Sequence, residues 1–572
     1  MASITKKTIR GKPYYYAREC KRVNGKPKIV WQKYLGRADD IIAAVSGHGP
    51  KAPTLAQPQE AIVTEFGAVV ALLAIAERLR LCDHIDRHVS KRGGGPSVGT
   101  YLLVAIVNRC VAPCSKASIA RWFEDTALRR LIDIDTKQLS SQRFWDNMER
   151  VSREAMEAIE RDITVEMVRR FDIDLQRVLF DATNFFTFID TFNARSTLAQ
   201  RGKSKEGRRA LRIVGLALLV SADFHVPLLH RTYPGNQPDA PTFANLTSAL
   251  VARYRELVDG AEHITLIFDK GNNSQDNLDA VEDSPYHFVG SLVPTQHADL
   301  LKVPARRLRS LDKEGLPGVT AWRTSQKVFG VKRTVLVTYN ENLFVAQSRT
   351  LLREIAKRQQ YLRELQLQLR RRRSGEVRGG RPPTVEGVTK KVAAWLKARH
   401  MKDLFHVEIT ERDGLPSLSY RFDEREWQRL QRTLLGKNIL FTDNDDWSDA
   451  DIVRGYRSQH HVETAFRRMK DPHRICLRPQ HHWTDQKVEV HVFCCVLALM
   501  LCSLLRREAH RQGIDHSIAE LLEELEKIRE VGVIYPPATA QDSPTLKMTL
   551  SSMSDGQREL YEALGLARYL ST

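Results

Sequence analysis

The stretch Val178–Asn184, which reads Val-Leu-Phe-Asp-Ala-Thr-Asn, constrains the fold of this 572-residue chain more than any other segment. Three apolar residues run directly into Asp181, and one small and two short polar residues follow it. The pattern predicts a buried strand that ends in a carboxylate, an arrangement that holds a charge rigidly at the edge of a sheet. Because a buried acid without partners is costly, we expect a cation or hydrogen-bond donors beside Asp181.

The charge of the chain indicates its class of partner. The formal net charge is +19 and the pI is about 9.6, a balance that favours nucleic acid first and an acidic membrane second. Most of the excess lies in two patches: residues 1–40 hold 11 Lys/Arg against 3 Asp/Glu, and residues 351–400 hold 14 against 4. A chain of this length also predicts two to four domains rather than one core.

Cysteine usage and the first residues predict the compartment. The eight cysteines are scattered, and the N-terminus lacks the apolar segment of a signal peptide, so we expect a reducing, cytoplasmic setting. The longest apolar run, 492–505, has 14 residues. That is too short to span a bilayer, so we predict a buried helix and no membrane partner.

The N-terminal region 1–45 and the block 60–170 are predicted to form separate domains. Asn24-Gly25 between two extended runs predicts a basic β-hairpin; its aromatic and cationic residues fit a clamp on nucleic acid or, equally, a packed hairpin with a solvated basic face. The block 60–170 is helical by periodicity. Its segments 115–123 and 139–148 suggest a helix-turn-helix that places 140–143 (Ser-Ser-Gln-Arg) on DNA, although short capped helices are common without that function.

From residue 175 the pattern changes to β-β-β-α-β-α-β. The predicted strands and helices, in chain order, are strands 175–184, 212–221 and 226–233, helix 239–258, strand 263–268, helix 275–281 and strand 287–292. This order puts Asp181 at the end of the first strand and Asp269 at the end of the fourth. The fold class is therefore α/β and multi-domain, with 171–294 as the first part of a mixed-sheet core.

An insertion, 295–447, is predicted to interrupt this core as a basic subdomain, because a segment of that length needs a core of its own. It contains a basic helix, 351–373, which ends in Arg370, Arg371, Arg372 and Arg373. The core resumes over 448–510, where Ser448 is the expected N-cap of a new helix. The remaining residues, 511–572, are predicted to form a helical tail.

The helix after Ser448 carries the other candidate site residues. Tyr456, Gln459, Glu463 and Lys470 follow one another at steps of 3, 4 and 7, which would put all four on one face of a continuous helix. For an isolated helix the preferred interpretation is an amphipathic helix with a solvated polar face. The two carboxylate-bearing strands upstream favour a functional interpretation instead.

Taken in order, Phe180-Asp181-Ala-Thr, Phe268-Asp269-Lys-Gly-Asn and the helix with Tyr456, Glu463 and Lys470 resemble the DDE transposases of bacterial insertion sequences. The chain looks like the branch whose ribonuclease-H-like core carries a large insertion and whose last helix bears a tyrosine-arginine-glutamate-lysine signature. Gln459 stands where that signature has arginine. The resemblance extends over most of the chain, about residues 8–510.

The resemblance implies a DNA transposase that binds terminal inverted repeats, cleaves strands by metal-dependent hydrolysis and joins 3′-hydroxyl ends to target DNA. Asp181, Asp269 and Glu463 would be the catalytic metal ligands, with Asp181 bridging two Mg²⁺ ions roughly 3.5–4 Å apart. Oxygen ligands suit Mg²⁺, and we expect Mn²⁺ to substitute. By resemblance, Tyr456 and Lys470 would bind phosphates of double-stranded DNA; Gln459 and Arg370–Arg373 are further candidates for contact with DNA.

Two function classes stay open: an active cut-and-paste transposase, and a catalytically lapsed DNA-binding protein on the same fold. Another ribonuclease-H-like nuclease is a further alternative. The resemblance also implies a homodimer in the DNA complex and a bacterial, nucleoid-associated protein. An ATPase is rejected because the phosphate-loop motif requires glycine at 197, where the chain has Thr197.

Overall fold

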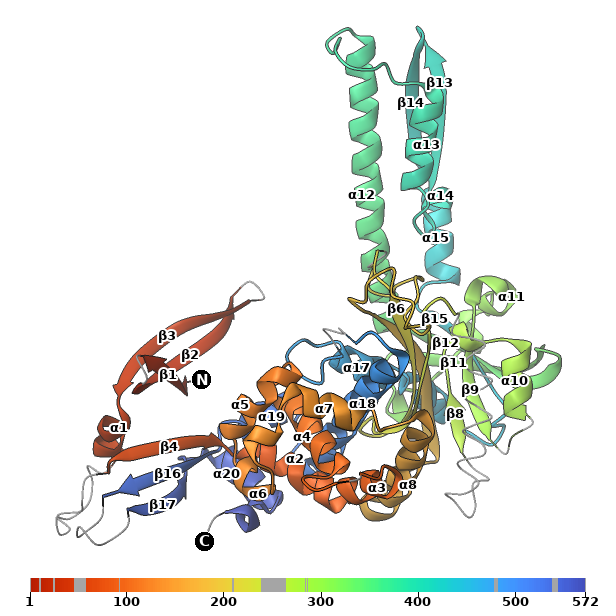
Figure 1. The fold of residues 1–572 in the computed structure, drawn as a ribbon. Coiled ribbons are helices and arrows are strands. Elements are labelled where there is room, and N and C mark those ends of the chain that lie inside the picture. The colour runs from red at the N-terminus through yellow and green to blue at the C-terminus, as the bar shows by residue number, and fades with distance from the viewer. Residues whose placement is uncertain are drawn as a thin grey trace. The chain divides into compact units, whose positions relative to one another are not determined.

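The computed structural model divides the chain into two compact units (Figure 1). The first unit combines Met1–Asp259 with His460–Thr572, and the second is Gly260–Gln459. The structure describes residues 2–9, 12–23, 26–45, 58–91, 93–207, 210–237, 264–282, 284, 286–477, 482–536 and 544–570. The predicted helix 239–258 lies outside the described residues. The mixed α/β, multi-domain class is confirmed.

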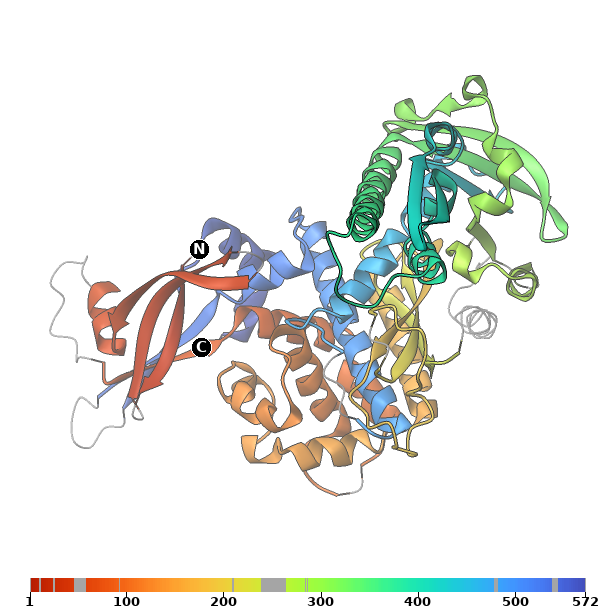
Figure 2. The same ribbon diagram turned by 90° about the horizontal axis from the view of Figure 1, so that it is seen from above.

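The first unit begins with an antiparallel sheet of strands β1 (Ala2–Ile9), β2 (Lys12–Val23) and β3 (Lys26–Gly36), in the order β1-β2-β3. The predicted hairpin is confirmed by the pairing of β2 with β3, while its turn residues 24–25 lie outside the described part. Strand β1 was not predicted. Helix α1 (Ala38–Val45) follows and contacts β2 and β3 (Figures 1 and 2).

A second sheet joins segments from both ends of the chain. Strand β4 (Glu60–Glu65) pairs antiparallel with β16 (Arg529–Tyr535), which pairs with β17 (Thr545–Leu550). The block 60–170 therefore starts with a strand, and the tail 511–572 is not wholly helical. Its helices are α19 (Ile518–Leu525) and α20 (Asp555–Ala563), followed by the 3₁₀ turn η8 (Leu566–Tyr569). Helix periodicity alone missed all three strands: β4 and β16 pair with each other across the length of the chain, and β17 pairs only with β16.

The rest of the block is helical, as predicted. Its α-helices are α2 (Gly67–Arg78), α3 (Leu81–His88), α4 (Val98–Val111), α5 (Ile119–Glu124), α6 (Leu128–Leu131), α7 (Ser141–Met148) and α8 (Arg153–Phe171). Ser140 caps α7 by accepting a hydrogen bond from the Arg143 amide. Because α6 lies between α5 and α7, the two predicted recognition segments are not consecutive helices.

The apolar run 492–505 lies inside α18 (Asp485–Arg511), the central helix of this unit. Helix α18 contacts α2, α4, α8 and β7 (Pro227–Pro234). Among the described residues, α18 is the one helix long and apolar enough to cross a bilayer, and the bent pair formed by α4 and the segment Lys116–Glu124 would be a second if it counted as one span. However, 94% of the apolar stretch of α18 is buried against protein, as in the core helix of a globular domain.

The core strands of the first unit are β5 (Arg177–Phe186), β6 (Ile213–Ser221) and β7, which pair antiparallel in the order β5-β6-β7. Every residue of β6 is buried, as expected for a strand covered on both faces. Helix α17 (His460–Met469) contacts β5 and β6. The site residues of this unit are carried by β5 and α17.

The second unit contains a mixed sheet in the order β10-β11-β12-β15-β9-β8. Strands β8 and β9 are parallel and the other neighbours are antiparallel. The bounds of its strands and of the helix between β8 and β9 are β8 (Thr265–Ile267), α10 (Gln275–Glu282), β9 (His287–Leu292), β10 (Arg309–Ser310), β11 (Val319–Val328), β12 (Val331–Asn340) and β15 (Lys437–Thr442). Since β15 pairs with β9, the predicted insertion 295–447 is partly built into the core sheet.

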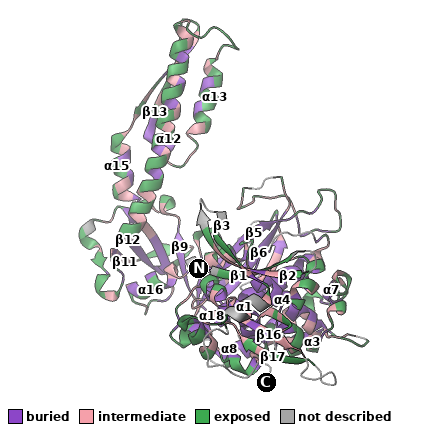
Figure 3. Ribbon diagram, turned by 90° about the vertical axis from the view of Figure 1, so that its left-hand side faces the viewer, coloured by how far each residue is buried: buried purple, intermediate pink, exposed green. Residues whose placement is uncertain are grey.

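Between β12 and β15 the chain forms an elongated arm (Figure 3). It consists of α12 (Glu341–Arg373), α13 (Val385–Trp395), α14 (Met401–Leu404), β13 (Phe405–Arg412), β14 (Leu415–Phe422) and α15 (Glu424–Thr433). The predicted basic helix 351–373 is confirmed and starts ten residues earlier, at the Asn340 cap. Four leucines and Ile355 are buried at helical spacing along α12, which contacts β14.

Candidate active site

Asp181 is placed in the middle of β5, so the prediction that the strand ends at this residue is wrong. The strand continues to Phe186 because Ala182 to Phe186 pair with Ala217 to Ile213 of β6. Short polar residues at 183 and 184 therefore did not terminate it. Asp181 is half-buried, and its Oδ1 accepts a hydrogen bond from the Ala182 amide at 2.8 Å. Strand alternation puts Asp181 and Thr183 on the same face of β5.

Lys470 brings a cation to the Thr183 side chain on this face of β5. Its Nζ donates a hydrogen bond to Thr183 Oγ1 at 2.8 Å and lies 3.7 Å from Glu206 Oε1. Same-face neighbours in a strand are about 6.6 Å apart, so the residue that Lys470 binds is the same-face neighbour of Asp181. Lys470 is 20% exposed, which leaves part of its charge accessible to an anionic partner.

Glu463 lies on α17, two turns before Lys470. The helix is held in place by its apolar side, where Val462, Ala465, Phe466 and Met469 are buried, and Glu463 itself is exposed. Seven residues advance about 10 Å along a helix and return to nearly the same face. The first unit thus brings the glutamate helix, its lysine and the Asp181 strand together.

The predicted single helix with four aligned polar residues is wrong. The structure has α16 (Asp449–Arg457), capped by Ser448 as predicted, and then the separate α17. Helix α16 ends because its last turn tightens: the Gln459 amide bonds to the Tyr456 carbonyl and the Ser458 hydroxyl to the Gly455 carbonyl. Gln459 is in the connecting turn and is only 9% exposed, so it offers little surface to DNA.

Asp269 belongs to the second unit, where two hydroxyl groups surround it. It follows β8 after Phe268 and is half-buried. Tyr456 on α16 places its hydroxyl 3.2 Å from Asp269 Oδ1 and 2.8 Å from Ser291 Oγ, and Ser291 Oγ donates to the same carboxylate oxygen at 3.4 Å. Sequence reasoning missed Ser291; the only signal was a hydroxyl residue inside the apolar strand β9.

The chemistry of the three carboxylates suits a hard divalent cation, because all their donor atoms are oxygen and each side chain is half-buried or exposed. Asp181 and Glu463 lie in one compact unit and Asp269 in the other. In the described part of the chain, no three His, Cys, Asp or Glu side chains form a metal-binding group. The oxygen donors of the three carboxylates therefore fit a divalent metal by their chemistry.

The four arginines that were predicted to bind DNA lie at the C-terminal end of helix α12, in the arm. Arg370 and Arg371 are exposed, and Arg372 and Arg373 are half-buried. Arg372 donates to the carbonyls of Gly379 and Gly380, and Arg371 lies 3.8 Å from Glu376. Arg370 and Arg373 form no ion pair within the described residues, so they are the members most available to an external phosphate.

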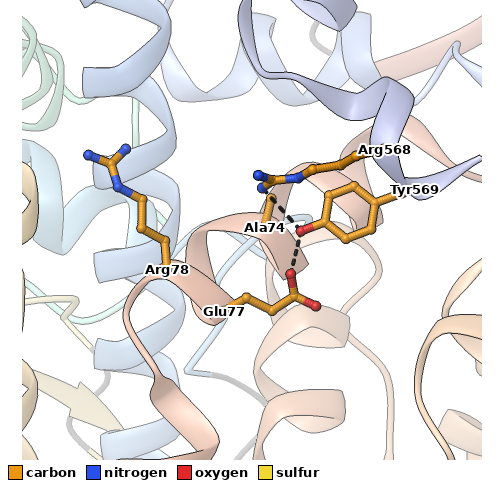
Figure 4. A pocket seen from close by; sticks show the side chains of 5 residues that line it. All are labelled: Ala74, Glu77, Arg78, Arg568 and Tyr569. Atoms are coloured by element: carbon orange, nitrogen blue, oxygen red, sulfur yellow. Dashed lines mark hydrogen bonds between the residues drawn. The ribbon is translucent and has the colours of Figure 1, made fainter.

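Two cavities lie elsewhere in the first unit. One, of about 500 Å³, is lined by Ala74, Glu77, Arg78, Arg568 and Tyr569 (Figure 4). Burial and the neighbouring Glu77 raise the pKa of Tyr569 to about 12, so its hydroxyl stays protonated and donates to Glu77. This network joins the chain end to α2. The other cavity, of about 420 Å³, lies beyond β5 and includes Phe188, Phe192 and Trp483.

Comparison with known proteins identifies the family. A family model described as a transposase DDE domain matches residues 176–501, a span that contains all three candidate carboxylates and Lys470. A search of curated proteins returns no match. One solved structure, a piggyBac transposase synaptic complex with hairpin DNA, is similar to this chain at 10% sequence identity, with a TM-score of 0.36. The similarity covers 80% of this chain and 79% of that one, and it is too weak to indicate a shared fold or function. Because the family model spans more than half of the chain, this protein belongs to the transposase DDE domain family.

Proposed function

We propose that this chain is an active cut-and-paste DNA transposase of a bacterial insertion sequence. It binds the terminal inverted repeats of its element, cleaves the strands and joins the freed 3′-hydroxyl ends to target DNA. The observation that carries the proposal is the position of Lys470, 2.8 Å from Thr183 on the Asp181 face of β5. A cation beside a carboxylate strand is what the binding of a phosphodiester next to bound metal requires.

Asp181, Asp269 and Glu463 would hold two Mg²⁺ ions, and Mn²⁺ would substitute for them. When bound, divalent ions activate a water molecule and neutralise charge on the leaving oxygen. The protein supplies no covalent nucleophile in this scheme: its carboxylates hold the ions, and β5 and α17 fix two of those carboxylates on packed elements. Such fixation is what keeps reacting groups in productive geometry.

The remaining site residues orient DNA and carboxylates. Lys470 binds a phosphate of the element end as a point charge. Tyr456, together with Ser291, orients Asp269. If Tyr456 also contacts DNA, it does so while its hydroxyl is held beside Asp269. Gln459, which replaces the signature arginine of the insertion-sequence branch, supports the connecting turn and contacts DNA only through the small part of its side chain that is exposed.

DNA partners are assigned by charge. Double-stranded element ends and target DNA are bound by the basic arm, with Arg370–Arg373 on phosphates, by the N-terminal sheet and by the helical block, including 140–143. Two copies of the chain pair the two ends, so the DNA complex contains a homodimer. The protein acts at the nucleoid in the bacterial cytoplasm.

The deciding experiment is Mg²⁺-dependent cleavage of DNA carrying the inverted repeats that flank the coding sequence. Wild type should nick and join these ends, whereas Asp181→Asn, Asp269→Asn and Glu463→Gln should bind them without cutting. A wild-type protein that binds the repeats and never cuts would indicate a lapsed enzyme. Cutting without joining, or without preference for the repeats, would indicate another ribonuclease-H-like nuclease.

A further inference from the structure

The N-terminal sheet presents three tyrosines on one face. In the register of the sheet Tyr14 is opposite Lys7, and Tyr16 is opposite both Thr5 and Tyr34. Directly paired residues and every second residue along a strand share a face. The ring centroids confirm the cluster: Tyr14 and Tyr34 are 6.2 Å apart, and Tyr16 and Tyr34 are 5.2 Å apart.

The opposite face packs on the protein around Tyr15, whereas Trp31, farther along β3 on the same face, is 46% exposed. Tyr15, which points away from the cluster, is 3% exposed, and its hydroxyl donates to the carbonyl of Ala61 in β4 at 3.1 Å. Helix α1 contacts both β3 and β4. By contrast, Tyr34 is 50% exposed, and Tyr14 and Tyr16 are half-buried. The tyrosine face is therefore an open surface of this unit.

Cations surround the tyrosine face. The Arg37 guanidinium lies over the Tyr14 ring at 6.0 Å from its centroid, and the register puts Arg18 one step beyond Tyr16. Neither Lys7 nor Arg18 forms an ion pair among the residues that the structure describes. An aromatic surface bordered by positive charge, in a segment with 11 Lys/Arg against 3 Asp/Glu over residues 1–40, suits nucleic acid best, because bases stack on the rings while phosphates meet the cations, whereas an acidic protein surface would use the cations alone.

We propose that this tyrosine face, consisting of Tyr14, Tyr16 and Tyr34 with Lys7, Arg18 and Arg37, binds single-stranded DNA by stacking unpaired bases on the rings. A duplex hides the faces of its bases, so only an unpaired strand can use exposed rings as stacking platforms. Three same-face positions along the strands span about 13 Å and three strands about 10 Å. This area accommodates two or three nucleotides, with the cations against their phosphates.

The inference rests on the proposed function only in taking DNA as the partner, and it assigns the sheet a role that neither the carboxylates nor the arm performs. Its site lies wholly within the first unit, on strands outside the segment that matches the transposase family model. Binding through this face is consequently separable from cleavage.

The test measures binding of the full-length chain to a fluorescent 20-nucleotide oligo-dT and to a 20-base-pair duplex of unrelated sequence, by anisotropy. Replacing Tyr14, Tyr16 and Tyr34 together by Ala should weaken oligo-dT binding at least about tenfold and duplex binding less than about twofold. The matching triple replacement by Phe keeps the rings and should bind oligo-dT within about twofold of wild type. Tyr34→Ala alone, at the most exposed of the three, should give a smaller loss in the same direction.

The control variant is Trp31→Ala, which removes an aromatic ring that is 46% exposed but paired with Glu19 on the other face of the sheet. It should leave oligo-dT binding unchanged, and thermal unfolding should show all variants folded. Unchanged oligo-dT affinity in the Ala triple, or an equal loss in the Phe triple, would overturn the inference; equal loss of duplex binding would make the face a duplex-backbone surface instead. Cleavage of element ends, assayed in parallel, separates the two ideas: inactive wild type with ring-dependent oligo-dT binding contradicts only the proposed function.

Discussion

The two aspartates of the candidate site are held by different chemistry. Asp181 lies within a paired strand, and Thr183, its neighbour on the same face, accepts a hydrogen bond from Lys470. Asp269 lies after a three-residue strand and is held by the hydroxyls of Tyr456 and Ser291. A cation accompanies the first carboxylate and neutral donors accompany the second.

The difference separates two tasks. Strand pairing already fixes the backbone at Asp181, so the neighbouring side chain can be used to bind substrate phosphate. Asp269 sits where regular structure has ended, and the hydroxyl groups restrain the rotation of its side chain. Hydrogen bonds that orient metal-binding carboxylates contribute to metal affinity, whereas a nearby cation contributes to binding of charge that develops in the reaction. Substitutions should separate these contributions.

The largest effect is expected from the carboxylates themselves, irrespective of their setting. Asp181→Asn, Asp269→Asn and Glu463→Gln keep size and remove charge; losing several kcal/mol of charge stabilisation corresponds to roughly a 10³-fold loss of cleavage rate. Single-turnover cleavage of element ends measures it, with DNA affinity as the control. Glu206→Gln, beside Lys470 but outside the proposed ligand set, should cost far less. A comparable loss there would mean that the ligand assignment is wrong.

Lys470→Ala should be next, at roughly 10²-fold, because it removes one preorganised charge from the first carboxylate's face. Lys470→Arg keeps the charge but not its compact geometry and should recover part of the rate. The measurement is the cleavage rate at saturating and at limiting DNA. The metal concentration that gives half-maximal rate should not change, and a large change in it would show that Lys470 acts on metal binding.

Tyr456→Phe should show the opposite behaviour. It removes only the hydroxyl that holds Asp269, so the metal concentration for half-maximal cleavage should rise roughly tenfold while the rate at saturating metal recovers. Ser291→Ala should act in the same direction, and the double variant should cost less than the sum because both groups contact one oxygen. If Tyr456→Phe instead lowered DNA affinity and left metal dependence unchanged, its predicted role on DNA would be the correct one.

These contrasts also show what the sequence could predict. The strand pattern around Asp181, the cap at Ser448 and the hairpin at 24–25 depend on local rules of periodicity and turn chemistry, and they led to correct elements. The end of β5 and the break after α16 depend on partners far away in sequence. Pairing with β6 extends β5 past three polar residues, and two hydrogen bonds near Ser458 end a helix whose polar spacing looked continuous.

The site residues likewise divide into those that local patterns could identify and one that depends on a distant partner. Residue types at Asp181, Asp269, Glu463 and Lys470 could be selected by their order and chemistry, and the structure does place Lys470 beside the Asp181 strand. Ser291 could not be selected, because a single serine in an apolar strand has no spacing signal. Its significance depends on the tyrosine of another helix reaching the same carboxylate.

The smallest expected effect on function comes from the arginines of the arm. They are far from both aspartates in sequence, and they are proposed to contact phosphates rather than particular bases. Each phosphate contact that is lost lowers the slope of log affinity against log salt by about 0.9. Replacing Arg370 and Arg373 by Ala should therefore reduce the slope by about 2, measured by anisotropy on duplexes of unrelated sequence.

Replacing Arg371 and Arg372 is the matched control: Arg372 already donates to Gly379 and Gly380, and Arg371 lies near Glu376, so the slope should change less. Equal slopes for both pairs would mean that these internal contacts exchange freely for phosphate. An unchanged slope for the first pair would place the DNA path elsewhere, leaving the cations near Asp181 and on the N-terminal sheet to account for the binding.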